Sequence, residues 1–112
     1  MFNYCVISGW VLNEPNLRYY GKDLAIADFK IAFWLVNHQG GTITVLCYDE
    51  LAIHAIRYVK KTETVMVCGY ISGDKWQSRD GRWWQSLHLN ASDVAVLDAE
   101  TIRREQEALL EK

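Results

Sequence analysis

Apolar and polar residues alternate along much of the chain, which is the period of β-strands rather than of helices. Five runs show this alternation: 4–12, 24–36, 42–48, 63–76 and 83–91. In the second run Phe29 and Ile31 share the apolar phase, while Lys30 lies in the opposite phase. Turn-forming residues separate the runs, the clearest being the Asp80-Gly81 pair. We therefore predict five strands, each with one face toward a core.

A helical period interrupts the strands between the third and fourth runs. Over residues 50–60 the apolar residues recur at helical spacing: Leu51, Ala52, Ala55, Ile56 and Val59. Asp49 precedes this stretch and is a candidate N-cap. Residues 99–112 are rich in Glu, Arg, Gln, Ala and Leu but contain few large apolar residues, which predicts a second, short and marginal helix.

The resulting order of three strands, a helix and two strands is that of the OB-fold. We predict an all-β fold, a five-stranded Greek-key barrel with one helix between strands 3 and 4 and a short C-terminal helix. The chain has 112 residues, which predicts one OB-fold domain over 1–98, followed by a short charged helix or tail over 99–112. Fold order alone does not assign a function, because this barrel carries many unrelated activities.

Aromatic residues are the feature of the composition that indicates a ligand. The chain contains five tryptophans, six tyrosines and three phenylalanines, and the densest group is Trp76-Gln77-Ser78-Arg79-Asp80-Gly81-Arg82-Trp83-Trp84. Lys75 and two arginines lie close to these rings. Because every base has a flat face and every phosphate a charge, exposed rings interleaved with cations suit a single nucleic-acid strand.

Net charge opposes strong binding of this kind. The chain has 12 Lys and Arg against 14 Asp and Glu, a formal net charge of −2. Because phosphate neutralisation supplies much of the affinity for nucleic acids, a near-neutral chain predicts weak binding unless its cations gather on one face.

Other classes of function find little support in the sequence. Cys5, Cys47 and Cys68 are odd in number, widely spaced and set in apolar runs, so we expect reduced, buried thiols and neither a disulfide framework nor a zinc cluster. The three histidines are scattered, and Asp49-Glu50 suits a helix start better than acid-base catalysis. We therefore expect no metal, no cofactor and no enzymatic activity. The apolar runs are shorter than the roughly 20 residues of a membrane span, and no signal-peptide pattern opens the chain, which predicts a soluble intracellular protein.

Four segments of the chain share motifs with one known family. They are Asn3 with Gly9-Trp10-Val11-Leu12, Pro15 and Leu17-Arg18-Tyr19; Leu24 to Ala32; Val45 to Leu51 with Tyr58-Val59-Lys60-Lys61; and Val65-x-Val67-x-Gly69-x-Ile71 with Trp76. These segments are similar to the first four strand patterns of the bacterial and organellar single-stranded DNA-binding proteins. Together they make residues 1 to about 97 resemble that family, although any one segment alone would be unspecific.

The resemblance implies a homo-oligomer, a tetramer with a dimer as the alternative, that binds single-stranded DNA in replication, repair and recombination. It implies no cofactor and no catalysis. By the same resemblance Tyr48 and Trp76 match stacking aromatics, and nearby lysines and arginines match phosphate contacts. The candidate DNA-binding residues are Trp76, Tyr48, Trp34, Trp84, Lys60, Lys61, Lys75, Arg79 and Arg82.

Three departures from the family pattern affect these expectations. The reversal at 37–41 is short where the family often has a long basic finger. Thr42 and Thr44 stand where many members have a tryptophan and an arginine, and Glu50 stands where a lysine is common. The sequence ends at Glu111-Lys112 without the Gly/Pro-rich linker and acidic Pro-Phe ending that are typical of the family. Recruitment of repair enzymes through such a tail is therefore not expected. Short variants of this kind resemble cyanobacterial and plastid-encoded members, which predicts a nucleoid-associated cytoplasmic location or, alternatively, the plastid stroma.

The aromatic and basic residues keep two interpretations. Trp and Tyr favour subunit interfaces for the same reasons that they favour nucleic-acid grooves, and Trp34, off the core phase, fits either. Trp83 and Trp84 face opposite sides of a strand, so at most one is expected to meet DNA. Lys60 and Lys61 at a helix C-terminus interact favourably with its macrodipole whether or not DNA is bound. The alternative function is a protein-interaction module, a replication or primosome accessory with weak or no DNA binding.

Overall fold

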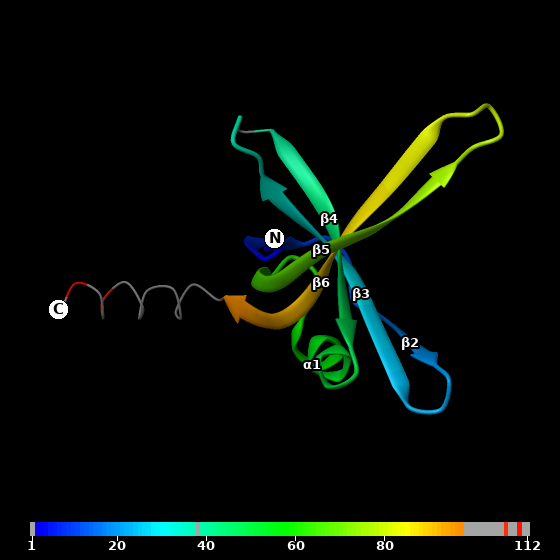
Figure 1. Ribbon diagram of the computed structural model, residues 1–112. Helices are drawn as coiled ribbons and strands as arrows, with labels where there is room; N and C mark the ends of the chain where they lie inside the picture. The colour runs from blue at the N-terminus through cyan, green and yellow to red at the C-terminus, as the bar shows by residue number, and fades with distance from the viewer. Residues whose placement is uncertain (1, 38, 98–106, 108–109, 111–112) are drawn as a thin grey trace.

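The computed structural model describes residues 2–37, 39–97, 107 and 110. Its elements in chain order are β1 (Cys5–Val11), β2 (Asn16–Tyr20), β3 (Leu24–Trp34), β4 (Gly40–Tyr48), α1 (Glu50–Tyr58), β5 (Thr64–Gln77) and β6 (Trp83–Leu97). The described chain is mostly β, with a helix between β4 and β5 as predicted (Figure 1). The helix predicted over 99–112 lies outside the described residues except for Glu107 and Leu110, and the domain division at residue 98 stays a prediction.

Five of the strands pair in a closed circuit. β1 is antiparallel to β5, β5 to β6, and β4 to β3, while β6 runs parallel to β4. Trp10 and Val11 at the end of β1 then pair with Ala32 and Ile31 of β3, which closes the circuit. β2 lies outside it and pairs with the first half of β3. The circuit gives the sheet an inner side, which can hold a core, and an outer side.

The described part of the chain contains six strands instead of the expected five, because β2 was not predicted. Four of its five residues are exposed, and only Leu17 is half-buried. No alternation of apolar and polar residues therefore marks this segment. β2 forms instead by pairing with β3 across the turn at 21–23, where Gly21 adopts a positive φ of 62°.

β6 continues to Leu97, beyond the predicted end at residue 91, because a β-bulge hides its second half from the pattern. The register shifts where Cys68 faces Asp93 and Gly69 faces Ala91, which leaves Ser92 as an extra residue of β6. A bulge moves the following side chains to the other face. Leu89 and Val94 are therefore both buried, although they are five residues apart and would point to opposite faces of a regular strand.

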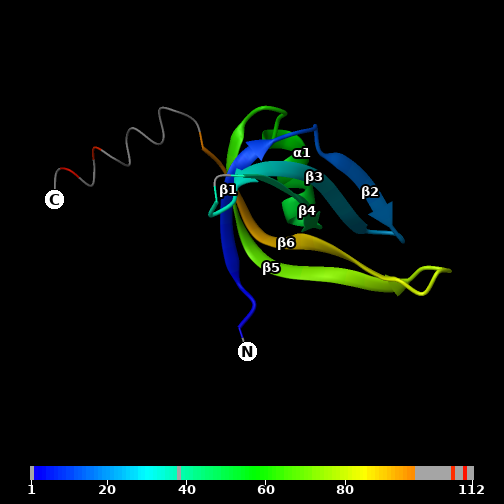
Figure 2. The ribbon, with the colours of Figure 1, turned by 90° about the horizontal axis from the view of Figure 1, so that it is seen from above.

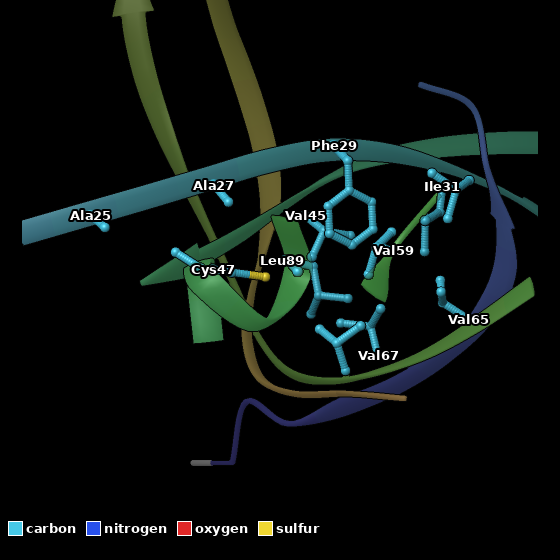
Figure 3. Close-up of a cluster of buried hydrophobic side chains, with 14 residues drawn as sticks. Ala25, Ala27, Phe29, Ile31, Val45, Cys47, Val59, Val65, Val67 and Leu89 are labelled. Carbon is cyan, nitrogen blue, oxygen red and sulfur yellow. The ribbon is translucent and has the colours of Figure 1, made fainter. Parts of the chain in front are cut away.

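The core fills the inner side of the circuit and follows the predicted phases. Phe29 projects from β3 among Val45, Val59 and Leu89, which come from three other parts of the chain (Figure 3). Cys47 is buried there, and burial raises the pKa of its thiol to about 12. The expectation of three buried cysteines is wrong for the other two, because Cys5 and Cys68 lie at half-buried positions.

α1 covers one end of the core. It packs against β3, β4 and β6, with Ala52 and Ala55 buried (Figure 2). Asp49 occupies the N-cap position but makes no side-chain cap hydrogen bond. Its Oδ1 atom instead accepts a hydrogen bond from the Ala25 N–H at 3.3 Å, which ties the start of α1 to β3. No helix among the described residues is long and apolar enough to cross a membrane.

Two residues of the first motif hold β1 in the circuit. Asn3 donates from Nδ2 to the Ile71 carbonyl oxygen at 2.6 Å and accepts at Oδ1 from the Ile71 N–H at 2.9 Å, so its side chain extends the pairing of β1 with β5. At Gly9 a Cβ atom would overlap the carbonyl oxygen of Ala32. The absence of a side chain therefore allows β1 to approach β3 where the circuit closes.

Replacing Gly9 with Ala is predicted to lower the free energy of unfolding by about 1–3 kcal/mol, because the added methyl group forces β1 away from β3. Gly40→Ala is the matched control, since a Cβ at Gly40 meets nothing within 4 Å. Urea unfolding of the two variants and the unmodified chain measures the difference. Equal unfolding midpoints for G9A and G40A would contradict the account of the closure.

Candidate nucleic-acid interface

The side of β3, β4, β5 and β6 that faces away from the core, together with the same side of β2, is here called the outer face. One row of paired residues defines it: Lys30, Thr44, His88 and Ser72, in the order β3, β4, β6 and β5. Each of these positions neighbours a core residue such as Phe29 or Val45 along its own strand, so its side chain points outward. The middle of the outer face is polar and carries Lys30 as an exposed cation.

Beyond this row β5 and β6 leave the circuit as a two-stranded arm, residues 72–88 (Figure 1). Trp76 pairs directly with Trp84, and both belong to the outer face. Lys75 and Trp83 lie on the reverse side, where the Lys75 Nζ atom is 5.3 Å from the centre of the Trp83 ring. Trp83 and Trp84 therefore lie on opposite sides of the arm, as expected, and Trp84 is the one that shares a face with Trp76.

A hydrogen-bonded turn closes the arm, as the Asp80-Gly81 pair predicted. The Ser78 N–H donates to the Arg82 carbonyl oxygen at 2.9 Å, the Gly81 N–H donates to the Ser78 carbonyl oxygen at 3.0 Å, and Gly81 has a φ of 84°. Asp80 organises the turn, because it accepts hydrogen bonds from the Ser78 hydroxyl and the Arg82 N–H and lies 3.4 Å from the Arg82 Nε. The Ser78 hydroxyl and then the Arg82 N–H hold the pKa of the Asp80 carboxyl below its ordinary value. Arg79 lies within this turn and is exposed.

β3 and β4 form a second arm, and its tryptophan lies on the same outer face. Trp34 pairs with Gly40 at the end of this arm and contacts Trp10 edge to face, with ring centres 6.3 Å apart. Gly40 and Trp84 each lie four residues beyond the pair Thr44 and His88, one on each arm. The two arms diverge beyond the pair Thr44 and His88 (Figure 1). One arm carries Trp34 and the other carries the Trp76–Trp84 pair.

The opposite end of the outer face carries Tyr48, the last residue of β4. It pairs with Ile26, and on the far side of β3 the residues Arg18 and Tyr20 of β2 share the same face. The rings of the predicted site are accessible: Trp34 is 65% exposed, Trp76 49%, Trp84 50% and Tyr48 46%. The structure therefore brings all four predicted aromatic residues to one face.

The predicted cations do not gather in the same way. Lys75 lies on the reverse of the arm, and Arg82 is paired with Asp80. Lys60 and Lys61 follow α1 at the start of β5, whereas the arm lies at the other end of that strand. The Lys61 N–H donates to the Glu14 Oε1 at 3.2 Å, which holds this segment near the β1–β2 connection.

Three residues of the outer face were missing from the predicted site. Lys30 could have been found, because the alternation of β3 already assigned it to the face opposite the core. Arg18 and Tyr20 could not, because β2 itself was not recognised. Arg18 forms an ion pair with Asp28 at 3.2 Å on the same face, so its charge is largely balanced.

The outer face offers exposed flat rings beside ion-paired arginines, an arrangement that can stack on planar groups. No cluster of three or more His, Cys, Asp or Glu that could hold a metal ion occurs within the described ranges 2–37 and 39–97.

Comparisons with known proteins agree with the sequence motifs. The model of the single-strand binding protein family matches residues 2–97. A protein of Oceanobacillus iheyensis described as a single-stranded DNA-binding protein is 29% identical over 104 residues, which cover 88% of this chain. The matched region spans 65% of the length of that relative.

Acidification is predicted to loosen the turn of the arm. The pKa of Asp80 is lowered in the folded state, so its ionised carboxylate stabilises the turn. This stabilisation is fully present above the unfolded pKa of about 3.9 and is lost as the pH falls through the lower folded pKa. Ser78→Ala is expected to raise the Asp80 pKa toward that unfolded value, as measured by a carboxyl-carbon NMR titration. Ser86→Ala, on the same arm, is the control. An Asp80 pKa that does not change in S78A would contradict this assignment.

Proposed function

The chain belongs to the single-strand binding protein family, and on that premise we propose that its outer face binds single-stranded DNA with little sequence preference. Bases would stack on Trp34, Trp76, Trp84 and Tyr48. The observation that carries the proposal is the cross-strand pair of Trp76 and Trp84, which lies on the outer face of the arm. Trp34 and Tyr48 are exposed on the same face. The name of the Oceanobacillus iheyensis relative supports the same ligand.

Stacking outweighs phosphate contacts in this proposal. A base stacked on an aromatic ring contributes about 1–3 kcal/mol, judged by alanine substitution. The cations Arg18, Arg82, Lys30 and Arg79 are all exposed, and the first two each have a carboxylate partner. With a net charge of −2, few phosphates are neutralised. Lys60 and Lys61 contribute only if the bound DNA continues around the molecule to the start of β5, the end that is remote from the arm.

We also propose that the closed circuit is the five-stranded Greek-key barrel of an OB-fold, with β2 as an added edge strand. The pairing of β1 with both β5 and β3 supports this description. In the cell such a protein would cover exposed single strands during replication, repair and recombination.

A homo-oligomer, a tetramer or a dimer, is proposed from the surface around β1. Among the described residues, 5–8 of β1 pair with β5 only, which leaves the other edge of this segment open. An open strand edge favours pairing with another chain. Tyr4, Val6, Met66 and Tyr70 are exposed on the outward side of β1 and β5 beside that edge.

The protein-interaction module remains the second candidate, and a specific observation favours it. Thr42 and Thr44 occupy the middle of the outer face between the two arms, where they offer neither a ring nor a charge. A protein partner covering the tryptophans would then replace DNA as the ligand.

Oligo(dT) is expected to quench tryptophan fluorescence, and Trp76→Ala to weaken its binding by about 1–3 kcal/mol through the loss of one stacked base. Trp83→Ala is the matched control, because it removes a similarly exposed tryptophan from the reverse side of the same arm. Equal losses in W76A and W83A would contradict the choice of face.

The same titration at several salt concentrations separates the two candidate functions. A slope of log affinity against log salt of roughly −0.7 per neutralised phosphate is expected, so the total slope should be shallow. Absence of any quenching at low salt, together with capture of a replication protein from nuclease-treated lysate, would favour the interaction module.

Val6→Asp is predicted to lower the oligomer mass, because it introduces a charge beside the open edge of β1. Val36→Asp, a fully exposed position on the connection between β3 and β4, is the control. Sedimentation velocity gives the masses. A V6D protein that sediments like V36D at every concentration would remove this surface as the interface.

A further inference from the structure

A pocket of about 280 Å³ lies at the Tyr48 end of the outer face, and no sequence pattern predicted it. It is lined by Tyr20, Leu24, Ile26 and Tyr48. Leu24 and Ile26 of β3 form its floor, because Tyr20 pairs with Leu24 from one side of β3 and Ile26 pairs with Tyr48 from the other. The two tyrosines therefore stand on opposite sides of an aliphatic floor.

The chemistry of this pocket selects a flat and uncharged ligand. Its floor has no polar side-chain atoms, and its two sides are phenol rings. Arg18 is the cation nearest along β2, directly opposite Ile26, and its guanidinium is already paired with Asp28 at 3.2 Å. The pocket is thus suited to an aromatic ring system rather than to a phosphate or a carboxylate.

We propose that this pocket holds one unpaired base of the bound strand, with Tyr20 and Tyr48 as its two walls. The inference rests on the proposed DNA-binding function and extends it to a residue, Tyr20, outside the predicted site. Without hydrogen-bonding groups in the floor, the pocket accepts any base. Arg18, at the rim, is placed to exchange its contact with Asp28 for a neighbouring phosphate.

Continuity with the rest of the outer face identifies the occupant. Tyr48 lies four residues along β4 from Thr44, and Trp84 lies four residues in the other direction along β6 from His88, the partner of Thr44. At about 3.3 Å per residue, Tyr48 in the pocket and Trp84 on the arm are roughly 26 Å apart on one face. The polar row with Lys30 lies between them. A strand several nucleotides long would therefore reach both ends, within the range of site sizes of OB-folds.

Substitutions of two adjacent tyrosines test the proposal. Tyr20→Ala is expected to weaken binding of a 15-nucleotide oligo(dT) by roughly 5- to 100-fold, whereas Tyr20→Phe retains the ring and most of the affinity. Tyr19→Ala is the matched control, because Tyr19 is similarly exposed, at 68% against 59% for Tyr20, but pairs with Ala25 on the core side of β2. Thermal melts followed by circular dichroism verify that the variants remain folded.

The outcomes distinguish this inference from the proposed function. If Y20A binds like Y19A while W76A is weakened, the pocket holds no base and the inference is overturned, although the arm still binds DNA. If the unmodified protein binds no oligo(dT) at low salt, the proposed function fails and the inference fails with it. Photocrosslinking of an oligonucleotide carrying 5-iodouracil should yield adducts in the peptide that contains Tyr20, and adducts confined to the arm would also overturn the inference.

Discussion

The closed circuit of strand pairing is the constraint on which the rest of this structure depends. Once β1 joins both β5 and β3, every side chain of the circuit must point either into the core or away from it. Phe29, Val45 and Leu89 then fill the interior, and the residues between them are forced onto the outer face. Gly9 permits the closure, because a side chain there would meet the carbonyl group of Ala32. The position of the proposed binding face therefore follows from the same pairing that makes the core.

Rings rather than charges give this face its chemistry. The four predicted aromatic side chains share it and are exposed, whereas several nearby cations are paired with carboxylates or lie elsewhere. The turn held by Asp80 illustrates the balance, because it orders the tip of the arm and at the same time neutralises Arg82. A face of this kind suits a ligand whose flat groups are exposed, and single-stranded DNA has that property where duplex DNA does not.

The sequence predicted the core phases, the helix and the turn of the arm, because each depends on local periodicity or on one pair of residues. It missed β2, whose exposed side chains follow no alternation, and it ended β6 early because the bulge at Ser92 reverses the phase. The four aromatic site residues could be chosen from composition and family resemblance. Their gathering on one face, the position of Lys75 behind the arm and the place of Tyr20 on that face could not, because they depend on which strands pair and in which register.

The indole N–H signals of the five tryptophans offer the most direct test that the outer face binds DNA. Each tryptophan gives one signal in a ¹H–¹⁵N NMR spectrum, and single substitutions assign them. On addition of oligo(dT), the signals of Trp76, Trp84 and Trp34 are predicted to shift strongly, while that of Trp83 on the reverse of the arm shifts little. Shifts confined to Trp83, or a spectrum unchanged at saturating oligonucleotide, would contradict the account.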